Sequence, residues 1–580
     1  MKFDDVLRQI GEFGPYQKRT YFFAAIPAIL VAFETLSVIF IFNIPPHRCA
    51  IPGYHGDSYY VKDGNHTLML NHSIPKTKDG WDKCHVFTEA LNDVIVANYH
   101  DVIEGTENGT VSGNESDVSQ MTSYRTSDSL STCDSWVYDT SIFESTIATD
   151  FDVVCDRSVY RPSSNMISEI GTLFGVFICG ILADRFGRKI PFYIGGLALI
   201  GGGFGIAFTS NLITLNVCRF VLGIARMAVF MNGFVVGMEI VGPSKRVFTG
   251  LFIEVLWCVG ELLLLLFAYS IRQWRYLEIA LSIPSIGLMF YWWLIPESPR
   301  WLASRGRGEE ALQVLEKIAA SNKTQMPKVE ETKGLFEADT QFSLRQVFQS
   351  RELRTRVLIV YSNMFVIAMV YYGLTLNVTN LGGDIFINFL IMAVLETIGF
   401  AVPTFLLDRV GRKPVYCVSI LVAGLACVIS LFPVMFGAPE WAVIALCMTG
   451  RLFVCTAYGV IYVYGAELFP TVIRASAMGT GVTVSRVGSL ISPYLADVGI
   501  LVGGKLENAL PLVVMGSPAI LVGLFSLWLP ETKGTRLPET LEDLDRFRSK
   551  RRCGGCYGTG DEDIKEMTVE GEAEGLTATR

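Results

Sequence analysis

Two similar stretches, GILADRFGRK (residues 180–189) and TFLLDRVGRK (residues 404–413), decide the fold of this chain. Each leaves an apolar run, passes through a DRxGRK cluster with four charges and one glycine, and enters another apolar run. Asp184 and Asp408, the first residues of the two clusters, lie 224 positions apart. A cluster that recurs at such an interval indicates an internal duplication.

Other landmarks recur at a similar interval. GMEIVGPSKR (237–246) matches GAELFPTVIR (465–474) at an offset of 228 residues, and PESPRWL (296–302) matches PETKG (530–534) at an offset of 234 residues. Because both the order and the spacing are kept, the sequence predicts two halves of the same topology, repeated in parallel orientation.

The composition indicates a membrane protein. Of the 580 residues, 51% are hydrophobic and 18% are charged, whereas soluble domains carry about 25% charged residues. Many apolar runs approach the roughly 20 residues that a membrane-spanning helix needs. We predict twelve spans, at residues 20–43, 163–183, 190–209, 212–240, 247–270, 274–295, 357–376, 384–407, 414–437, 440–464, 475–502 and 508–529.

The predicted fold is therefore an all-α membrane protein with twelve transmembrane helices in two parallel-repeated six-helix halves. We divide the chain into an N-terminal segment (1–19), an N-terminal half (20–295) that includes a long polar loop (44–162), a linker (296–356), a C-terminal half (357–529) and a tail (530–580).

The polar loop at 44–162 has the features of an extracellular segment. It contains four N-x-S/T sequons and four cysteines, namely Asn65, Asn71, Asn108 and Asn114 and Cys49, Cys84, Cys133 and Cys155. Sequons together with an even number of cysteines are typical of a glycosylated, disulfide-bonded loop outside the cell. Four cysteines allow three pairings, and the sequence does not select one of them.

Basic residues define the orientation. With the polar loop outside, both DRxGRK clusters, the GPSKR segment (242–246) and both termini fall on the cytoplasmic side, where Lys and Arg are enriched. We expect a multi-pass protein of the cell membrane with both termini in the cytoplasm. In the tail, RFRSKRRCGGC (546–556) is predicted to contact anionic membrane lipids, with Cys553 or Cys556 as a palmitoylation site.

The charges of the DRxGRK clusters are candidate gating residues. The structural alternative is that these charges only keep the loops on the cytoplasmic side of the membrane. A gating role is favoured because an acid at a helix end can pair with cations in one conformation and release them in another. The gating candidates are Asp184, Arg185, Arg188, Asp408, Arg409, Arg412, Glu239 and Glu467.

The duplicated DRxGRK clusters resemble those of the major facilitator superfamily of secondary transporters. Within it, CDSWVYDTSIFESTIATDFDVVC (133–155) and YYGLTLNVTNLGGDIFIN (371–388) resemble the organic cation, carnitine and organic anion transporters. LFAYSIRQWR (266–275) is most similar to the carnitine and organic cation branch. The resemblance implies transport driven by solute or ion gradients. GMEIVG is followed by Pro243, not by a phosphate-binding loop of G-x-x-x-x-G-K-S spacing, so we expect no ATP hydrolysis.

Ionisable residues inside a membrane are costly, and each is a candidate site residue. Glu34 is predicted to contact the cationic group of a substrate or, alternatively, to pair with a buried cation of a neighbouring helix. Arg226 either pairs with an acid, for which Glu34, Glu254 and Glu261 are candidates, or stays unpaired and favours anions. Glu396 matches an acidic position of the family, where a structural or gating role competes with substrate contact.

Arg486 lies in the middle of the eleventh predicted span. The family resemblance implies that this position selects substrate charge, being basic in the anion and carnitine types. A guanidinium binds a carboxylate through two parallel hydrogen bonds, so Arg486 favours substrates that carry a carboxylate. The alternative is a structural ion pair.

Aromatic residues are further candidate ligands. Tyr371, Tyr458 and Tyr462 are placed to present ring faces to a central cavity, where quaternary ammonium groups bind by cation–π attraction. The alternative for such residues is the aromatic belt at the membrane interface.

The leading functional hypothesis is a secondary transporter of small organic zwitterions or cations, with carnitine-like compounds first. An organic anion exchanger and a substrate sensor without transport are the alternatives. An enzyme is not expected, because we find no metal-ligand cluster and no nucleophile motif. We predict no metal, no cofactor and no nucleic acid partner, and the sequence leaves open whether sodium or a proton is co-transported. The oligomeric state is likewise open.

Overall fold

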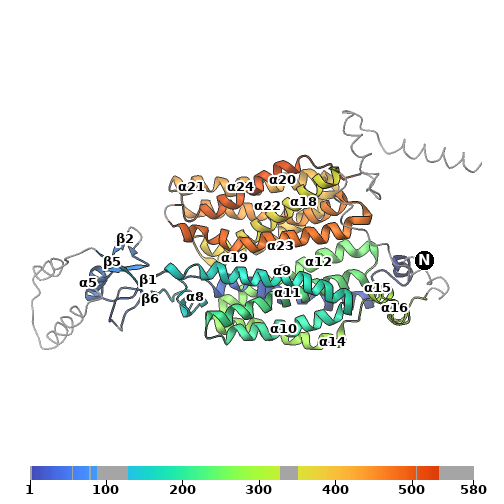
Figure 1. Ribbon diagram of the computed structural model, residues 1–580, viewed down its shortest axis with the longest axis horizontal. Coiled ribbons are helices and arrows are strands. Elements are labelled where there is room, and N and C mark those ends of the chain that lie inside the picture. The colour runs from blue at the N-terminus through green and yellow to red at the C-terminus, as the bar shows by residue number, and fades with distance from the viewer. Residues whose placement is uncertain are drawn as a thin grey trace, which may run out of the picture.

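The protein folds into two groups of long helices with a small loop domain at one end (Figure 1). The computed structural model describes residues 3–54, 56–77, 80–87, 129–326, 351–503 and 506–534. The sequons at Asn108 and Asn114 and the basic segment 546–556 lie outside these residues. In Figure 1 the loop domain is at the left, and the N-terminal residues lie at the right beside α15 (Pro299–Ser304) and α16 (Gly308–Asn322). We call these two ends of the bundle the loop side and the basic side.

The N-terminal half begins with a span from Pro15 to Ile41 that is divided into three helices, α2 (Pro15–Ala25), α3 (Pro27–Leu36) and α4 (Val38–Ile41). The division at Pro27 follows from its missing amide hydrogen, which ends one hydrogen-bond ladder and is tolerated at the start of the next. The rest of this half is the lower group in Figure 1: α9 (Tyr160–Phe186), α10 (Lys189–Ala207), α11 (Leu212–Ile240), α12 (Arg246–Ser270), α13 (Trp274–Ser282), the 3-10 segment η5 (Ile283–Phe290) and α14 (Tyr291–Leu294).

The C-terminal half is the upper group in Figure 1. It consists of α18 (Arg351–Asn377), α19 (Ile385–Val410), α20 (Arg412–Ile429), α21 (Leu431–Met435), α22 (Glu440–Leu468), α23 (Thr471–Val502) and α24 (Leu510–Ser526).

Ten helical stretches among the described residues are long and apolar enough to cross a membrane, and they match the first ten predicted spans. The shorter apolar helix α24 lies where the twelfth span was predicted. The eleventh is α23, whose apolar sequence is interrupted by Arg486 and Asp497 and is less hydrophobic for that reason. The predicted all-α fold with two helical halves is confirmed.

Among the described residues, the helix pairs with the most extensive contact between the halves are α9 with α23 and α12 with α19. The largest hydrophobic core continues from one half into the other. On the loop side, for example, the ring centroids of Phe40 in α4 and Phe389 in α19 are 5.0 Å apart. Polar side chains near α9, α12, α19 and α23 are therefore the ones that can meet between the halves.

The loop domain is held together by short antiparallel strand pairs and two disulfides. β1 (His47–Cys49) pairs with β6 (Trp136–Tyr138), and β4 (His85–Phe87) pairs with β5 (Leu130–Thr132). The disulfides join Cys49 to Cys133 and Cys84 to Cys155. The structure therefore contains the pairing Cys49–Cys133 and Cys84–Cys155, which is one of the three that the sequence allowed.

The helix α5 (Gly64–Ser73) of the loop domain carries two of the four predicted sequons. Asn65 and Asn71 are both exposed there, so their side-chain amides are accessible. Their glycosylation stays a prediction.

A buried ion pair fixes the first part of the loop domain. Arg48 and Asp57 are joined by two hydrogen bonds, of which the one from Nη1 to Oδ2 measures 2.9 Å. Asp57 also accepts from the Ile51 amide at 2.8 Å, and its Oδ1 lies 2.9 Å from Nε2 of His66. Burial alone would raise the pKa of Asp57, but the hydrogen bonds and the charge of Arg48 outweigh burial, and the pKa is lowered.

Candidate functional site

The first DRxGRK cluster forms an ion-pair network on the basic side of the N-terminal half. Nη1 of Arg188 lies 3.2 Å from Oδ1 of Asp184, and Nη2 lies 3.3 Å from Oε1 of Glu239. The Asp184 side chain is 73% exposed, so this pair contributes little free energy. The pair with Glu239 is far less exposed, and Glu297 adds a further contact by accepting from the Arg188 amide at 2.8 Å.

The second cluster repeats this arrangement in the C-terminal half. Arg412 lies 3.4 Å from Asp408 and 3.2 Å from Glu467. Glu531 accepts from the Arg412 amide at 2.9 Å, as Glu297 does in the first cluster. The duplicated sequence therefore builds the same polar network twice.

The glycines of both clusters are required by geometry. Gly187 and Gly411 have φ angles of +96° and +115°, which side chains other than glycine rarely adopt. A Cβ atom on Gly187 would also lie 2.2 Å from Oε2 of Glu297, and one on Gly411 would lie 2.7 Å from Oε2 of Glu531. Because the turn has a glycine, a carboxylate can pack directly against its backbone.

Two of the predicted gating residues lie beside these networks. The guanidinium of Arg185 lies 5.4 Å from the ring centroid of Phe186. The backbone carbonyl of Arg409 accepts a hydrogen bond from Nζ of Lys533 at 2.6 Å. The ion pairs of the two networks are formed by Arg188 and Arg412.

A cavity of about 100 Å³ lies between the two halves. Helices of both halves supply its walls, with α3, α9, α11 and α12 on one side and α18, α19, α22 and α23 on the other. The lining residues are Val31, Thr35, Glu169, Thr172, Arg226, Met227, Phe230, Glu254, Trp257, Tyr371, Tyr372, Phe400, Tyr458 and Arg486. Four predicted site residues are among them, namely Arg226, Tyr371, Tyr458 and Arg486.

Both arginines of the cavity are held by neighbours but keep free donors. Nη1 of Arg486 donates to the Tyr372 hydroxyl at 2.8 Å. Nη2 of Arg226 donates to the hydroxyls of Ser168 at 2.9 Å and Thr172 at 3.2 Å. Nε of each arginine is buried and has no hydrogen-bond partner among the described residues. Each guanidinium of the cavity wall therefore keeps a donor that no described residue satisfies.

Glu169 is the acid that the structure places beside these arginines. Its Oε1 lies 3.7 Å from Nη2 of Arg226, and its Oε2 accepts from the Ser489 hydroxyl of α23 at 3.1 Å. The acids that the sequence suggested as partners of Arg226 were Glu34, Glu254 and Glu261, and the ion pair is formed with none of these three. Glu169 lies inside a predicted span, so a complete survey of ionisable residues within the spans would have found it.

The cavity also contains an acid without a partner. Glu254 of α12 lines the cavity and forms no hydrogen bond or ion pair with the described residues. Trp257, one turn further along the same helix, also lines the cavity, and its ring centroid is 6.1 Å from that of Phe230. An unpaired carboxylate beside aromatic faces is suited to a quaternary ammonium group.

The tyrosines of α18 and α22 form one aromatic cluster. The ring centroids of Tyr371 and Tyr458 are 4.9 Å apart, and those of Tyr371 and Tyr372 are 5.2 Å apart. The Tyr462 hydroxyl donates to the Tyr458 hydroxyl at 3.3 Å, although Tyr462 is not part of the cavity wall. Tyr462 therefore reaches the cavity only through Tyr458.

Glu396 lies behind the cavity wall in a buried ion pair. Its carboxylate binds the guanidinium of Arg451 and accepts from the Tyr371 hydroxyl at 2.5 Å. Arg451 also donates to the Tyr371 carbonyl at 2.7 Å. This arrangement fits the structural alternative for Glu396, with Tyr371 between it and the cavity.

Glu34 also lies outside the cavity wall. Nη1 of Arg226 donates to the backbone carbonyl of Glu34 at 3.3 Å, while the Glu34 carboxylate turns toward Gly203 of α10. A Cβ atom on Gly203 would lie 3.0 Å from Oε1 of Glu34. The carboxylate is therefore not placed to contact a ligand in this cavity.

The halves are in contact on the loop side of the cavity. Arg161 of α9 lies 3.6 Å from Asp497 of α23, and both side chains are almost fully buried. Nearby, the hydroxyls of Ser163 and Tyr494 are 2.8 Å apart. The sequence did not single out Arg161, because it lies just before the second predicted span.

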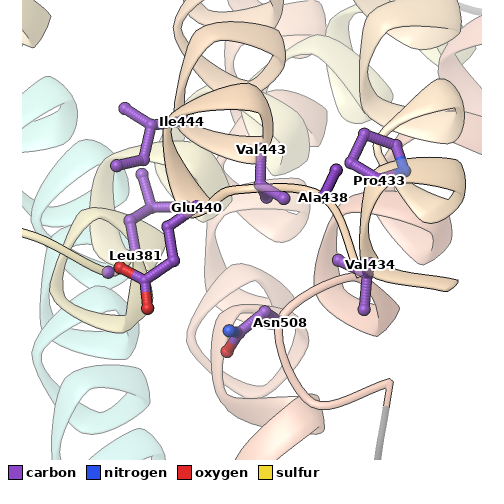
Figure 2. A pocket seen from close by; sticks show the side chains of 9 residues that line it. Leu381, Pro433, Val434, Ala438, Glu440, Val443, Ile444 and Asn508 are labelled. Carbon is purple, nitrogen blue, oxygen red and sulfur yellow. The ribbon is translucent and has the colours of Figure 1, made fainter. Parts of the chain in front are cut away.

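A second pocket, of about 190 Å³, lies on the loop side of the C-terminal half (Figure 2). Its walls are mostly apolar, with Glu440 and Asn508 as the polar side chains that Figure 2 shows. It is larger than the cavity between the halves, but none of the predicted site residues lines it. The cavity between the halves is therefore the candidate substrate site.

Comparison with known proteins agrees with this fold. Residues 103–544 match the family model described as "Sugar (and other) transporter". The chain is 34% identical to the organic cation transporter protein of Drosophila melanogaster, with 95% of this chain and 96% of the relative covered. It is 32% identical to organic cation/carnitine transporter 2 of Mus musculus, with 94% of each covered.

The fold is also that of a solved transporter structure. The proton:xylose symporter XylE, bound to 6-bromo-6-deoxy-D-glucose, superposes with a TM-score of 0.53 at 17% identity, covering 91% of this chain and 99% of XylE. The relatives are named as transporters and not as enzymes. The chain belongs to the organic cation and carnitine transporter family of the major facilitator superfamily.

Proposed function

We propose that this protein carries small organic zwitterions or cations, with carnitine-like compounds first, across the cell membrane by alternating access. The loop side is extracellular, and both termini are cytoplasmic. The names of the relatives, organic cation transporter and organic cation/carnitine transporter, support this class of substrate.

One observation carries the proposal: the cavity wall contains an unpaired acid as well as two arginines with free donors. Glu169 and Glu254 together balance the charges of Arg226 and Arg486. A neutral zwitterion enters such a cavity without leaving a net charge in a poorly solvated space, which places zwitterions before pure cations.

Each group of a carnitine-like substrate has a candidate partner. The carboxylate binds Arg486, whose guanidinium is suited to two parallel hydrogen bonds. The quaternary ammonium lies near Glu254 and the faces of Trp257, Tyr371 and Tyr458, where each cation–π contact contributes about 0.5–2 kcal/mol.

An organic anion exchanger is the second candidate, because two arginines line one cavity. The ion pair of Arg226 with Glu169 weakens this reading, since Glu169 already neutralises one guanidinium. A sensor without transport is the third reading, and it predicts binding without flux.

Alternating access is supported by the distribution of contacts between the halves. The Arg161–Asp497 pair closes the loop side of the cavity in this conformation. The two DRxGRK networks brace each half separately on the basic side, so the halves can rock as units.

Uptake into cells that express this chain tests the proposal. We would compare labelled carnitine, tetraethylammonium and p-aminohippurate, each with and without sodium, at measured surface expression. Saturable carnitine uptake that is lost in Arg486→Ala is the expected result. Transport of p-aminohippurate without carnitine favours the anion exchanger, and carnitine binding without uptake favours the sensor.

A further inference from the structure

A second polar cluster is buried in the N-terminal half, outside the cavity. Glu34 of α3 is 5% exposed and Glu278 of α13 is 1% exposed. The Ser37 hydroxyl, one turn beyond Glu34, donates to Oε1 of Glu278 at 3.2 Å. The two carboxylates lie within electrostatic range of each other and repel each other when both are charged.

Gly203 of helix α10 packs against this cluster. A Cβ atom on Gly203 would lie 2.3 Å from the Ser282 hydroxyl and 3.0 Å from Oε1 of Glu34. Ser282 is one turn beyond Glu278 on α13, so these side chains converge on the same point from two helices. Any side chain larger than glycine at position 203 would fill the space above the carboxylate.

Most oxygens of this cluster have no hydrogen-bond partner among the described residues. Both carboxylate oxygens of Glu34, Oε2 of Glu278 and the Ser282 hydroxyl are buried and have none among the described residues. An ionised carboxylate in such surroundings is costly unless it is paired and hydrogen-bonded. The cluster as it stands is short of hydrogen-bond donors.

The neighbouring charges leave one negative charge in excess. The cations that act on the two carboxylates are Arg219 and Arg226, both on α11. Arg226 is shared with Glu169, and Arg219 donates to Asn165 at 2.8 Å. Three acids, Glu34, Glu278 and Glu169, thus face two guanidinium groups.

We propose that Glu34 and Glu278 form a proton-binding site that holds one shared proton in this conformation. The proton supplies the missing positive charge and, as a carboxyl hydroxyl on Glu34 or Glu278, a further hydrogen-bond donor inside the cluster. It comes from water on one side of the membrane and is released to water on the other, and no other bond changes.

Arg226 connects this proton site to the substrate cavity. Its guanidinium lines the cavity and also binds the backbone carbonyl of Glu34. A substrate carboxylate bound to Arg486 in this cavity also attracts Arg226, and movement of Arg226 toward it removes positive charge from the carboxylate pair and strengthens proton binding. This coupling rests on the proposed transport function, whereas proton binding itself does not.

Infrared difference spectroscopy of the purified full-length protein tests the proton site without any substrate. A protonated carboxyl group has a carbonyl stretching band that a carboxylate lacks. At neutral pH we expect the intensity of this band in the wild type to fall by the same amount in Glu34→Gln and in Glu278→Gln, because the two residues share one proton. Glu440→Gln, a change of an exposed acid in the other half, is the matched control and should leave the band unchanged.

Three spectroscopic results would overturn the proton site, and a folding defect would be a fourth. The three are a band that neither variant changes, a band that also disappears in Glu440→Gln, and a band that changes when choline replaces sodium, which would assign the site to sodium. Glutamine has the shape of a protonated carboxyl group, so both variants should fold. Loss of folding in Glu34→Gln would also contradict the proposal.

Coupling is tested in proteoliposomes with labelled carnitine and tetraethylammonium. We expect an imposed pH gradient to change the initial rate of uptake severalfold in the wild type and not in Glu34→Gln. A rate that is independent of the gradient in the wild type overturns the coupling. If the infrared result is as expected but neither compound is transported, the proton site stands and the proposed transport function fails.

Discussion

Glu169 of α9 accepts a hydrogen bond from the Ser489 hydroxyl of α23, with 3.1 Å between Oε2 and Oγ, and so links the two halves inside the cavity. Its other carboxylate oxygen lies 3.7 Å from Arg226. Glu169 therefore stands where a substrate carboxylate would be attracted, and together with Glu254 it determines the charge of the cavity.

Replacing Glu169 should change substrate preference. Glu169→Gln leaves two arginines against Glu254 alone, and the added positive charge favours anions. We expect the ratio of p-aminohippurate uptake to carnitine uptake to rise about tenfold, which corresponds to about 1.4 kcal/mol. Ser489→Ala removes the hydrogen bond but keeps the charge, so its ratio should stay close to that of the wild type. An equal fall in the uptake of both compounds would contradict this role.

Substitutions at Arg486 should separate the contribution of its charge to carnitine binding from the contribution of its planar hydrogen-bond geometry. Arg486→Ala is expected to raise the KM for carnitine at least about tenfold, since a charge-assisted hydrogen bond contributes about 1.5–3 kcal/mol. Arg486→Lys should fall in between, because an ammonium keeps the charge but not the planar pair of donors. Tyr372→Phe removes the hydroxyl that now binds Arg486 and should not raise KM. A change of maximal rate without a change of KM in Arg486→Ala would point to a structural role.

The repeated basic-side networks predict a kinetic effect far from the cavity. Glu297→Gln and Glu531→Gln each weaken the bond of a carboxylate to the backbone amides of a DRxGRK turn. Because these residues do not line the cavity, we expect a lower maximal uptake rate at equal surface expression and an unchanged KM. Asp184→Asn, whose side chain is largely exposed, is the control and should have little effect. A raised KM in Glu297→Gln would show that the networks act on the site directly.

Lowering the pH should destabilise the first part of the loop domain, because it protonates Asp57. Its pKa is lowered in the folded state, so its contribution to stability is complete above the ordinary pKa of about 3.9 and is lost as the pH falls through the lower, folded-state value. Hydrogen exchange of the Ile51 amide, corrected for its intrinsic rate, should be faster in Asp57→Asn than in the wild type at neutral pH. The difference should shrink as the pH falls below 4, by the same linkage. A difference that stays constant over this range would assign the effect to shape and not to charge.

The fold could be predicted from the sequence because the sequence signals on which the prediction depends are repeated and local. The DRxGRK turns, the apolar runs and the basic loops each recur, and each depends on residues close together in the chain. Pairing of distant charges did not follow in the same way. Arg226 meets Glu169 and not an acid named in advance, and Glu34 meets Glu278, because helix rotation decides which side of a span faces which neighbour.

Position along a predicted span was likewise insufficient to predict which residues line the cavity. Arg486 and Glu396 lie at similar depths of their helices, yet Arg486 lines the cavity and Glu396 is buried behind Tyr371. Glu254 was considered only as a partner for Arg226, and the structure leaves it unpaired in the cavity wall. The disulfide pairing required the strand pairs that bring Cys49 beside Cys133.

The charge of Glu254 is the most direct test of the central claim that this cavity binds a zwitterion. We would measure uptake of labelled carnitine and p-aminohippurate in cells expressing the wild type, Glu254→Gln and, as a control, Glu440→Gln, at equal surface expression. We expect saturable carnitine uptake by the wild type and the control, and in Glu254→Gln a KM for carnitine raised about tenfold, or about 1.4 kcal/mol, with no loss of p-aminohippurate uptake. Carnitine uptake that is unchanged in Glu254→Gln, or absent in the wild type while p-aminohippurate is transported, would contradict it.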